Sequence, residues 1–379
     1  MATGGQGVQQ SYSATIPLKR MVTDRILMTD PMSIAGLNAL GLHNESKFAF
    51  VNEPGRSYEW LEDTYLDRSD TAADVNMTSV TTTTTIAVTT GTKFNVGDVI
   101  QIDTEYMWVS GISTNTLTVT RDFDGTQATH ASTSVVYIRY NSRLEGAAVG
   151  TNNGFTEPTS GYNYSAILQK PVNVSRSSAL FKRYGIVNVV EREIDKAMDE
   201  LMMKLNLALY HGVRAIGTTS TPRSMGGLGT FLTTNLSTAS SAALTQKMIE
   251  DELQDCWTGG GNPDLILCGA WAKRKLGSFF EGYVRTSRDE TRGGIAIDQL
   301  INPLGGGYVD VVVDRHCPTN YLWILDRKKL GFITIDPFFY EELGKVGDTA
   351  AYGEVVGEYG FVATHEKAHS AVYSFSITA

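Results

Sequence analysis

The sequence has few cysteines and no long apolar run, and both features restrict the class of protein. Its 379 residues include only three cysteines, at positions 256, 268 and 317. They are odd in number, far apart and without a C-x-x-C pair, which argues against a disulfide framework or zinc ribbon and favours a reducing compartment. No run approaches the roughly 18 apolar residues of a membrane-spanning helix. Met1 to Gln10 lacks the basic start and apolar core of a signal peptide, so we expect a soluble protein made in the cytosol.

Charged residues are also scarce. They make up 19% of the chain, and acidic residues exceed basic ones to give a formal net charge of −9. A surface of this kind predicts no strong hold on a polyanion such as DNA. Small basic groups occur at Lys182-Arg183, Lys273-Arg274-Lys275, Arg327-Lys328-Lys329 and around Arg285, Arg288 and Arg292. Solvated faces or contacts with an acidic neighbour explain these groups better than nucleic acid.

One long amphipathic helix is predicted between Gly185 and Gly212. Its apolar residues recur at steps of three and four, which keeps them on one face; they include Ile186, Val190, Ile194, Leu201, Leu205 and Leu209. Glu200 precedes Lys204 by four residues, a spacing that favours an ion pair. At about 1.5 Å per residue the helix would be roughly 40 Å long. It must therefore support whatever packs on it.

The region before this helix is rich in β-strand patterns. Short alternating segments at 96–103, 106–112, 116–120 and 134–140, separated by turn residues, predict a small β-barrel or sandwich between about Met77 and Tyr140. The threonine run at 81–85 is interpreted as strand, because β-branched residues favour strands. Extended segments flank this domain on both sides. An isolated two-stranded arm is marginally stable, so we expect it to lie on a neighbouring copy of the chain.

The region after the helix reads as mixed α+β. Helices are predicted at 245–257 and 270–280, and strands at 264–268, 308–313, 321–325, 331–335, 354–364 and 370–377. The first fifteen residues are polar and glycine-rich, and residues 17–42 read as an arm with at most a short helix. The chain as a whole is long enough for two or three domains.

The sharpest chemical motif is His365-Glu366-Lys367-Ala368-His369, which matches the H-E-x-x-H pattern of zinc metalloproteases. That chemistry needs both histidines on one helical face, whereas the flanking segments here alternate as strands. No His, Asp or Glu follows His369 as a third ligand. The glycines of Met225 to Gly229 match no dinucleotide or phosphate loop, and Asp122 and Asp124 are better explained by a hairpin turn. We therefore expect no catalytic, cofactor or metal site.

The order of arm, β excursion, long helix, α+β domain and closing strand pair resembles the major capsid proteins of tailed bacteriophages, which have the Hong Kong 97-type fold. Local stretches resemble the branch with a β-domain inserted in the extended loop; these stretches are Tyr58 to Asp63, Gln169 to Ser175, Glu191 to Leu201, Pro222 to Gly229, Val313-Asp314-Arg315, Leu322 to Asp326 and Glu358 to His369.

This resemblance implies an α+β fold with five parts. They are an N-terminal arm (1–47), an extended loop (48–76 and 142–174), an inserted small β-domain (77–141), a peripheral domain with the spine helix (175–235 and 335–379) and an axial domain (236–334).

It also implies a structural protein, not an enzyme, that assembles into hexamers and pentamers of an icosahedral head around double-stranded DNA. Its partners would be other copies of itself, a portal, and scaffolding or decoration proteins; it would need no cofactor and no membrane. It would be part of the virion, made and assembled in the host cytoplasm. Two alternatives stay open: an encapsulin-like compartment shell, and a zinc metalloenzyme using His365 and His369.

Overall fold

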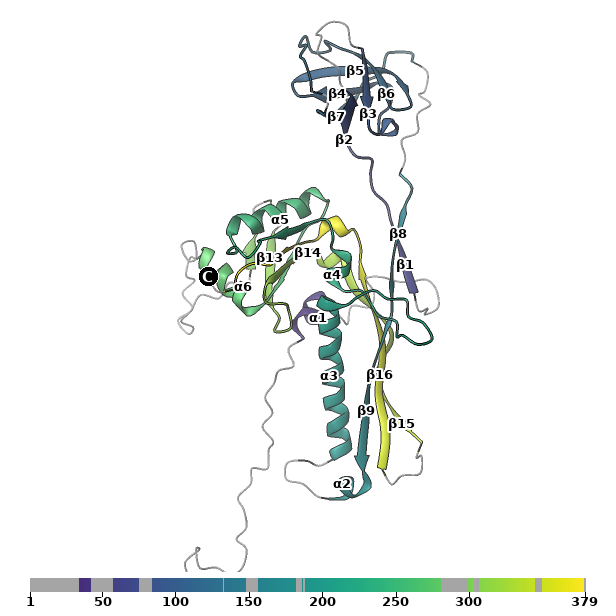
Figure 1. Cartoon of the computed structure of the whole chain (residues 1–379), viewed down its shortest axis with the longest axis vertical. Coiled ribbons are helices and arrows are strands. Elements are labelled where there is room, and N and C mark those ends of the chain that lie inside the picture. Colours follow the sequence, from purple (N-terminus) through teal and green to yellow (C-terminus); the bar gives the residue numbers. More distant parts are fainter. Residues whose placement is uncertain are drawn as a thin grey trace, which may run out of the picture. The chain divides into compact units, whose positions relative to one another are not determined.

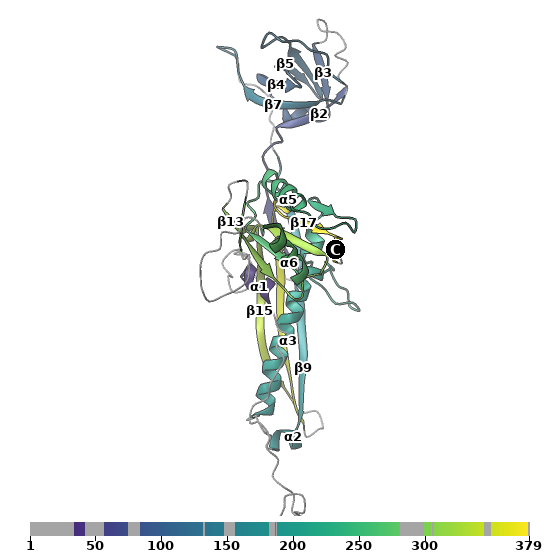
Figure 2. The same cartoon turned by 90° about the vertical axis from the view of Figure 1, so that its left-hand side faces the viewer.

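The computed structural model describes residues 34–41, 57–74, 84–131, 133–147, 156–181, 186, 188–280, 299–302, 304, 307–344 and 350–377 (Figures 1 and 2). The chain divides into two compact units, residues 61–161 and the remainder, and each has its own hydrophobic core. The expectations for the first fifteen residues, for residues 81–83 of the threonine run, and for the basic groups at 182–183 and around Arg285, Arg288 and Arg292 lie outside the described residues.

The larger unit contains a six-stranded sheet. Its strand order is β10 (Leu236–Thr238), β17 (Ser370–Tyr373), β14 (Tyr321–Leu325), β11 (Leu265–Cys268), β13 (Tyr308–Val313) and β12 (Gln299–Ile301). Helices α5 (Gln246–Thr258) and α6 (Ala270–Phe280) share a core with Ile266 and Cys268 of β11. Leu265 and Leu267, which alternate with them, belong to a second core with α1 (Ala35–Leu40) and the end of α3 (Val189–His211). Both faces of the sheet are therefore covered, which explains why β11 is an uninterrupted apolar run.

A second, three-stranded sheet lies alongside α3 (Figure 1). Its order is β15 (Leu330–Leu343), β16 (Ala350–Ala363) and β9 (Ala166–Ser175), and all of its pairs are antiparallel. Val172, Val174 and Val355 face α3 and pack against Ala197 and Leu201. After β9 the chain forms the short helix α2 (Arg176–Leu180) before it enters α3.

Helix α3 confirms the predicted apolar stripe, and its start corrects the predicted boundary. It begins at Val189, not Gly185, because the Asn188 side chain caps it by accepting the backbone N–H of Val190 at 3.0 Å. Leu201 and Leu205 are fully buried, as the periodicity predicts. Glu200 forms its direct ion pair with Lys170 on β9, and the predicted attraction to Lys204 is a smaller contribution to the lowered pKa of Glu200.

The smaller unit is a closed barrel of six strands. Their order is β2 (Ser69–Asp74), β3 (Thr85–Val88), β6 (Thr116–Thr120), β5 (Glu105–Ser113), β4 (Asp98–Ile102) and β7 (Val135–Asn141), with a short 3₁₀ turn at Gly91–Lys93. The four segments predicted as strands correspond to β4, β5, β6 and β7. The expected start of this domain at residue 77 is wrong, because β2 pairs with both β3 and β7 and closes the barrel. Antiparallel closure removes the free sheet edges.

The boundaries expected inside the larger unit also need correction. The β17 strand, expected in the peripheral domain, pairs with β14 and β10 within the six-stranded sheet. Residues 330–334, expected in the axial domain, open β15 and pair with β16. The predicted closing strands do not pair with each other, since β16 and β17 belong to different sheets. Hydrogen-bond register, which periodicity does not reveal, decides both assignments.

The helix α1 agrees with the short helix allowed for residues 17–42, but its burial corrects the assignment of this part of the chain to an N-terminal arm. Leu37 and Leu40 are buried in the same core as Leu209 and Leu228, so this part of the segment belongs to its own subunit. Two shorter strands, β1 (Ser57–Glu62) and β8 (Thr159–Tyr164), pair with each other, and α4 (Leu228–Phe231) follows the glycine-rich turn. Across the described residues, none of the helices combines the length and apolarity needed to cross a bilayer.

Candidate functional site

The H-E-x-x-H segment forms the predicted turn between strands. It contains one 3₁₀ turn, Glu366–Ala368, flanked by β16 and β17, and His365 takes a left-handed conformation with φ of 51°. His369 is buried: its Nδ1 accepts the N–H of Asp326 at 3.2 Å, and its Nε2 lies 3.3 Å from the carbonyl oxygen of Thr364. Burial lowers the pKa of His369 to about 4, so the ring is neutral at pH 7.

Glu366, the residue that would act as general base in a zinc enzyme, holds a neighbouring loop instead. Its Oε1 accepts the backbone N–H of Thr233 at 2.6 Å, and its Oε2 accepts the hydroxyl of Thr234 at 2.8 Å. Burial alone would raise the pKa of Glu366, but these hydrogen bonds outweigh it and lower the pKa. The segment therefore has a structural role. It connects β16 to β17, and its side chains and backbone hold residues 233–235 by hydrogen bonds. Over the described ranges, no three His, Cys, Asp or Glu side chains gather as ligands for a metal ion.

A buried carboxylate ties the N-terminal helix to the long helix. Asp314 Oδ2 accepts hydrogen bonds from the Gly36 N–H at 2.8 Å, Asn206 Nδ2 at 2.8 Å and the Tyr210 hydroxyl at 2.9 Å, while Oδ1 accepts the His316 N–H at 2.9 Å. A Cβ at Gly36 would come within 2.5 Å of the Tyr210 hydroxyl oxygen, so only glycine fits. The Val313-Asp314-Arg315 stretch carried the family resemblance, but periodicity alone did not reveal this role.

Buried polar side chains hold the strand pair β1 and β8, through which the chain leaves the larger unit and returns to it. This strand pair is called the root of the excursion. Asn163 Nδ2 donates to the carbonyl oxygens of Phe361 at 2.7 Å and Gly226 at 3.0 Å, and its Oδ1 accepts the Gly226 N–H at 2.8 Å. The Tyr58 hydroxyl donates to the same Phe361 carbonyl at 2.9 Å. Strands β1 and β8 are therefore fixed where they leave the larger unit.

The glycine-rich turn before α4 packs on the end of α3. A Cβ at Gly227 would lie 2.4 Å from the carbonyl oxygens of Ala208 and Leu209, and one at Gly212 would lie 2.4 Å from that of Ala208. The turn needs glycine for this close backbone approach, not for binding a phosphate. The structure thus explains the Met225 to Gly229 run as a packing feature.

The barrel contains a buried ionic cluster. Arg121 donates two hydrogen bonds to Glu105, at 2.8 and 2.6 Å, and His130 Nε2 lies 3.0 Å from the same carboxylate. Burial would raise the pKa of Glu105, but bonds from Arg121, the Ala128 N–H and His130 outweigh it and lower the pKa to about 2. The predicted turn follows Arg121, with Asp122 and Gly125 at positive φ. The cluster ties the loop after β6, with Ala128 and His130, to Glu105 of β5.

Among the described residues, α3 covers one face of the three-stranded sheet and no helix covers the other. Register places matched residues of β9, β16 and β15 in rows on this face, such as Ile167, Glu358 and Asp336, or Gln169, Val356 and Phe339. A further row contains Pro171, Glu354 and Glu341. The face therefore alternates apolar side chains with carboxylates.

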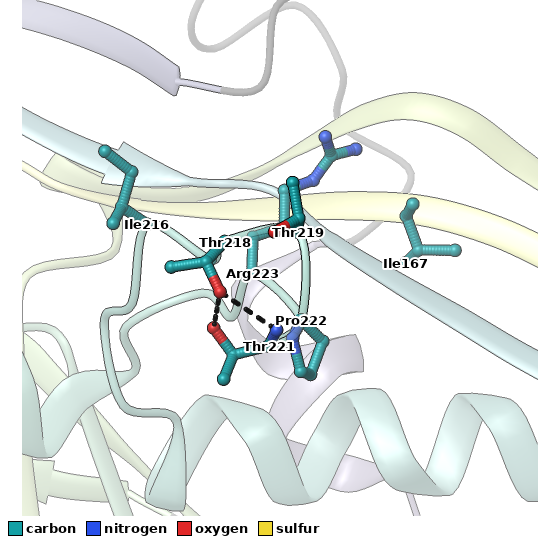
Figure 3. A pocket seen from close by; sticks show the side chains of 8 residues that line it. Ile167, Ile216, Thr218, Thr219, Thr221, Pro222 and Arg223 are labelled. Carbon is teal, nitrogen blue, oxygen red and sulfur yellow. Dashed lines mark hydrogen bonds between the residues drawn. The ribbon is translucent and has the colours of Figure 1, made fainter.

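A pocket of about 610 Å³ opens beside the first of these rows (Figure 3). It lies between Ile167 of β9 and the loop 216–223, whose Thr218 and Thr221 hydroxyl oxygens are 2.8 Å apart. Arg223, also in the lining, forms an ion pair with Glu358. Ile167 and Ile216 remain 55% and 52% exposed, so the single chain leaves an apolar surface open here. Surfaces of this kind mark contacts with other molecules.

Comparison with solved structures identifies the class of fold. The capsid subunit of an empty GTA particle is similar with a TM-score of 0.53 and 9% identity over 95% of each chain. The capsid of Myoviridae phage XM1 gives 0.50 and 10% identity over 97% of this chain and 99% of that chain. A holo-SrpI encapsulin complex from Synechococcus elongatus PCC 7942 gives 0.42 and 12% identity over 59% and 78%. The mixed α/β fold is thus similar to that of phage capsid structures.

The family follows from the sequence. The family model described as SU10 major capsid protein matches residues 3–375, almost the whole chain, and the chain belongs to this family. No curated protein matches the sequence. The chain is therefore a bacteriophage major capsid protein, a structural component of the virion and not an enzyme.

Proposed function

We propose that the chain is the subunit of an icosahedral head built from hexamers and pentamers around a double-stranded DNA genome. The observation that carries this proposal is the family match over residues 3–375, together with a fold that leaves one sheet face open for contacts. Many modest contacts suffice in a shell, because their simultaneous formation gives avidity. The net charge of −9 suits a container wall that does not hold the DNA by its phosphates.

The parts of the chain take the following roles in this proposal. The helix α3 is the spine of a peripheral domain built from β9, β15 and β16, and the six-stranded sheet with α5 and α6 is the axial domain. The strands β1 and β8 begin the extended loop, and the barrel is the domain inserted in it. Heterologous contacts close into rings, and the rings tile the shell. Portal, scaffolding and decoration proteins join during assembly in the host cytoplasm.

Electron microscopy with analytical sedimentation of the purified chain tests the proposal. The expected result is closed shells, rings of five or six, or curved sheets. A chain that stays monomeric or dimeric, both alone and when co-expressed with the proteins encoded beside it, would contradict a shell function. Particles filled with an enzyme and not with DNA would support the encapsulin-like alternative.

A further inference from the structure

An apolar knob, defined here as Leu180 and Phe181, stands at the end of the short helix α2, which follows β9. Each is 70% exposed, an unusual degree for two adjacent large apolar side chains. Arg176 is the first residue of α2, Leu180 is its last and Phe181 follows it; Arg176 has no ion pair within the described part of the chain. Lys182 and Arg183 follow in the sequence. The knob is therefore apolar, and basic residues precede and follow it in the sequence.

The open sheet face has the complementary character. Its pocket is lined by Ile167 and Ile216, and the row of Pro171, Glu354 and Glu341 on the same face carries two carboxylates. Glu341 and Glu354 are exact cross-strand partners, and like charges placed opposite each other destabilise a sheet. Neither forms an ion pair with a residue that the structure describes; Glu354 accepts only a hydrogen bond from Gln169. A cation from outside the subunit would relieve this repulsion.

One chain cannot bring its own knob to its own pocket. Ile167 is near the start of β9 and Ser175 is its last residue, with the knob beyond it. At about 3.3 Å per residue these two ends of the strand lie roughly 25 Å apart. The strand is held in place by ten consecutive pairs with β16. The occupant must therefore come from a second copy.

We propose that Leu180 and Phe181 of one copy occupy the pocket between Ile167 and loop 216–223 of the next copy. Arg176 of the first copy then faces the carboxylates of Glu341 and Glu354. The pocket volume of about 610 Å³ lies within the range of sites that hold several side-chain-sized groups. Because knob and pocket are different surfaces, the contact is heterologous and extends from copy to copy. The inference rests on the proposed shell function and specifies one of its contacts.

Disulfide trapping tests the contact. The three native cysteines are buried, and burial raises their thiol pKa values, so cysteines introduced at the surface are the reactive ones. The double variant Phe181→Cys, Ile216→Cys, assembled and treated with copper–phenanthroline as oxidant, should lose most of its monomer to a ladder of cross-linked multimers. A disulfide needs Cα atoms within about 7 Å, so a bond within one copy is excluded. The matched control, Phe181→Cys with Trp257→Cys on α5, should give no ladder.

Charge reversal and footprinting provide independent readouts. Arg176→Glu should lower the assembled fraction about fivefold, as should Glu341→Lys, and combining them should restore it. In wild-type particles, hydroxyl-radical oxidation of Phe181 and Ile216 should both fall relative to unassembled chain. Normal particles with no ladder and unchanged oxidation would overturn this contact and leave the shell function standing. Failure of the wild-type chain to assemble at all would instead overturn the shell function and this contact with it.

Discussion

The Tyr210 hydroxyl donates a 2.9 Å hydrogen bond to Asp314 Oδ2, which joins the end of α3 to the turn after β13. The same oxygen accepts the Gly36 N–H, so three segments distant in sequence share one buried acceptor. Desolvation by burial, reinforced by the nearby Cys317 and Asp314, raises the pKa of Tyr210 and keeps the phenol as a donor. This one carboxylate explains why residues 34–41 belong to the subunit core.

Replacing that carboxylate should be among the most damaging single changes in the chain. Asp314→Ala leaves the N–H groups of Gly36 and His316, the Asn206 amide and the Tyr210 hydroxyl without their acceptor. Each buried polar group left unpaired costs about 1–3 kcal/mol, so we expect a loss of at least about 3 kcal/mol. Urea unfolding of the unassembled chain measures it. Tyr210→Phe should lose only about 1 kcal/mol, and a similar cost for both variants would contradict the shared-acceptor role.

A charge on the buried stripe of α3 should prevent folding of the larger unit. Leu201 is fully buried between α3 and the three-stranded sheet. Leu201→Asp should therefore cost several kcal/mol and abolish soluble subunits. Soluble expression followed by size-exclusion chromatography checks this. Lys204→Asp changes an exposed position of the same helix and should leave expression intact; equal loss for both would show that general helix disruption, not burial, is responsible.

The root of the excursion should depend on one amide. Asn163→Leu removes two donated hydrogen bonds and two accepted bonds, from the N–H groups of Gly226 and Tyr164, while keeping a side chain of similar size. We expect hydrogen exchange of peptides covering 57–62 and 159–164 to accelerate at least tenfold, with little change in the barrel strands. Mass spectrometry of exchanged peptides provides the measurement. Asn173→Leu on exposed β9 is the control, and unchanged exchange at the root would show that Tyr58 alone holds it.

The sequence predicted local elements better than their pairing. The α3 stripe, the β4 to β7 segments and the strands at 308–313 and 321–325 follow from periodicity, because each shows its pattern within a few turns or pleats. The pairing of β17 with β10 joins residues more than a hundred positions apart. The closure of the barrel by β2 depends on its pairing with β7, about sixty residues later. The roles of Asp314 and Asn163 were missed for the same reason. A single buried polar residue produces no periodic pattern in the sequence, so periodicity cannot reveal it.

The barrel cluster should make the smaller unit sensitive to acid. The pKa of Glu105 is about 2 in the folded chain against 4.5 for the free group, so its contribution is present above about pH 4.5 and is lost as pH falls toward 2. Glu105→Gln should remove this dependence and destabilise the barrel by up to about 3 kcal/mol at pH 7. Hydrogen exchange of residues 98–120, corrected for the intrinsic rate at each pH, measures it. Asp124→Asn, in the exposed turn, should not change the profile.

Glu252 should give the larger unit the opposite dependence on pH. It is buried on α5, and its Oε2 has no hydrogen-bond partner in the described structure. Burial, with the nearby Asp255 and Asp251, raises its pKa to about 7, although Ser370 and Ser237 act in the other direction. Because the folded state holds a proton that the unfolded state releases near pH 4.5, stability should fall as pH rises from about 4.5 to 7.

Glu252→Gln tests this directly, since it keeps the shape of the protonated acid. The variant should be up to about 3 kcal/mol more stable than wild type at pH 8 and nearly equal at pH 4.5. Urea unfolding followed by tryptophan fluorescence reports mainly the larger unit, which contains Trp60, Trp257, Trp271 and Trp323. Glu250→Gln, at an exposed position of the same helix, should leave the wild-type slope unchanged. A parallel pH profile for wild type and Glu252→Gln would mean that the carboxyl is ionised or solvated in the folded chain, contrary to its buried position.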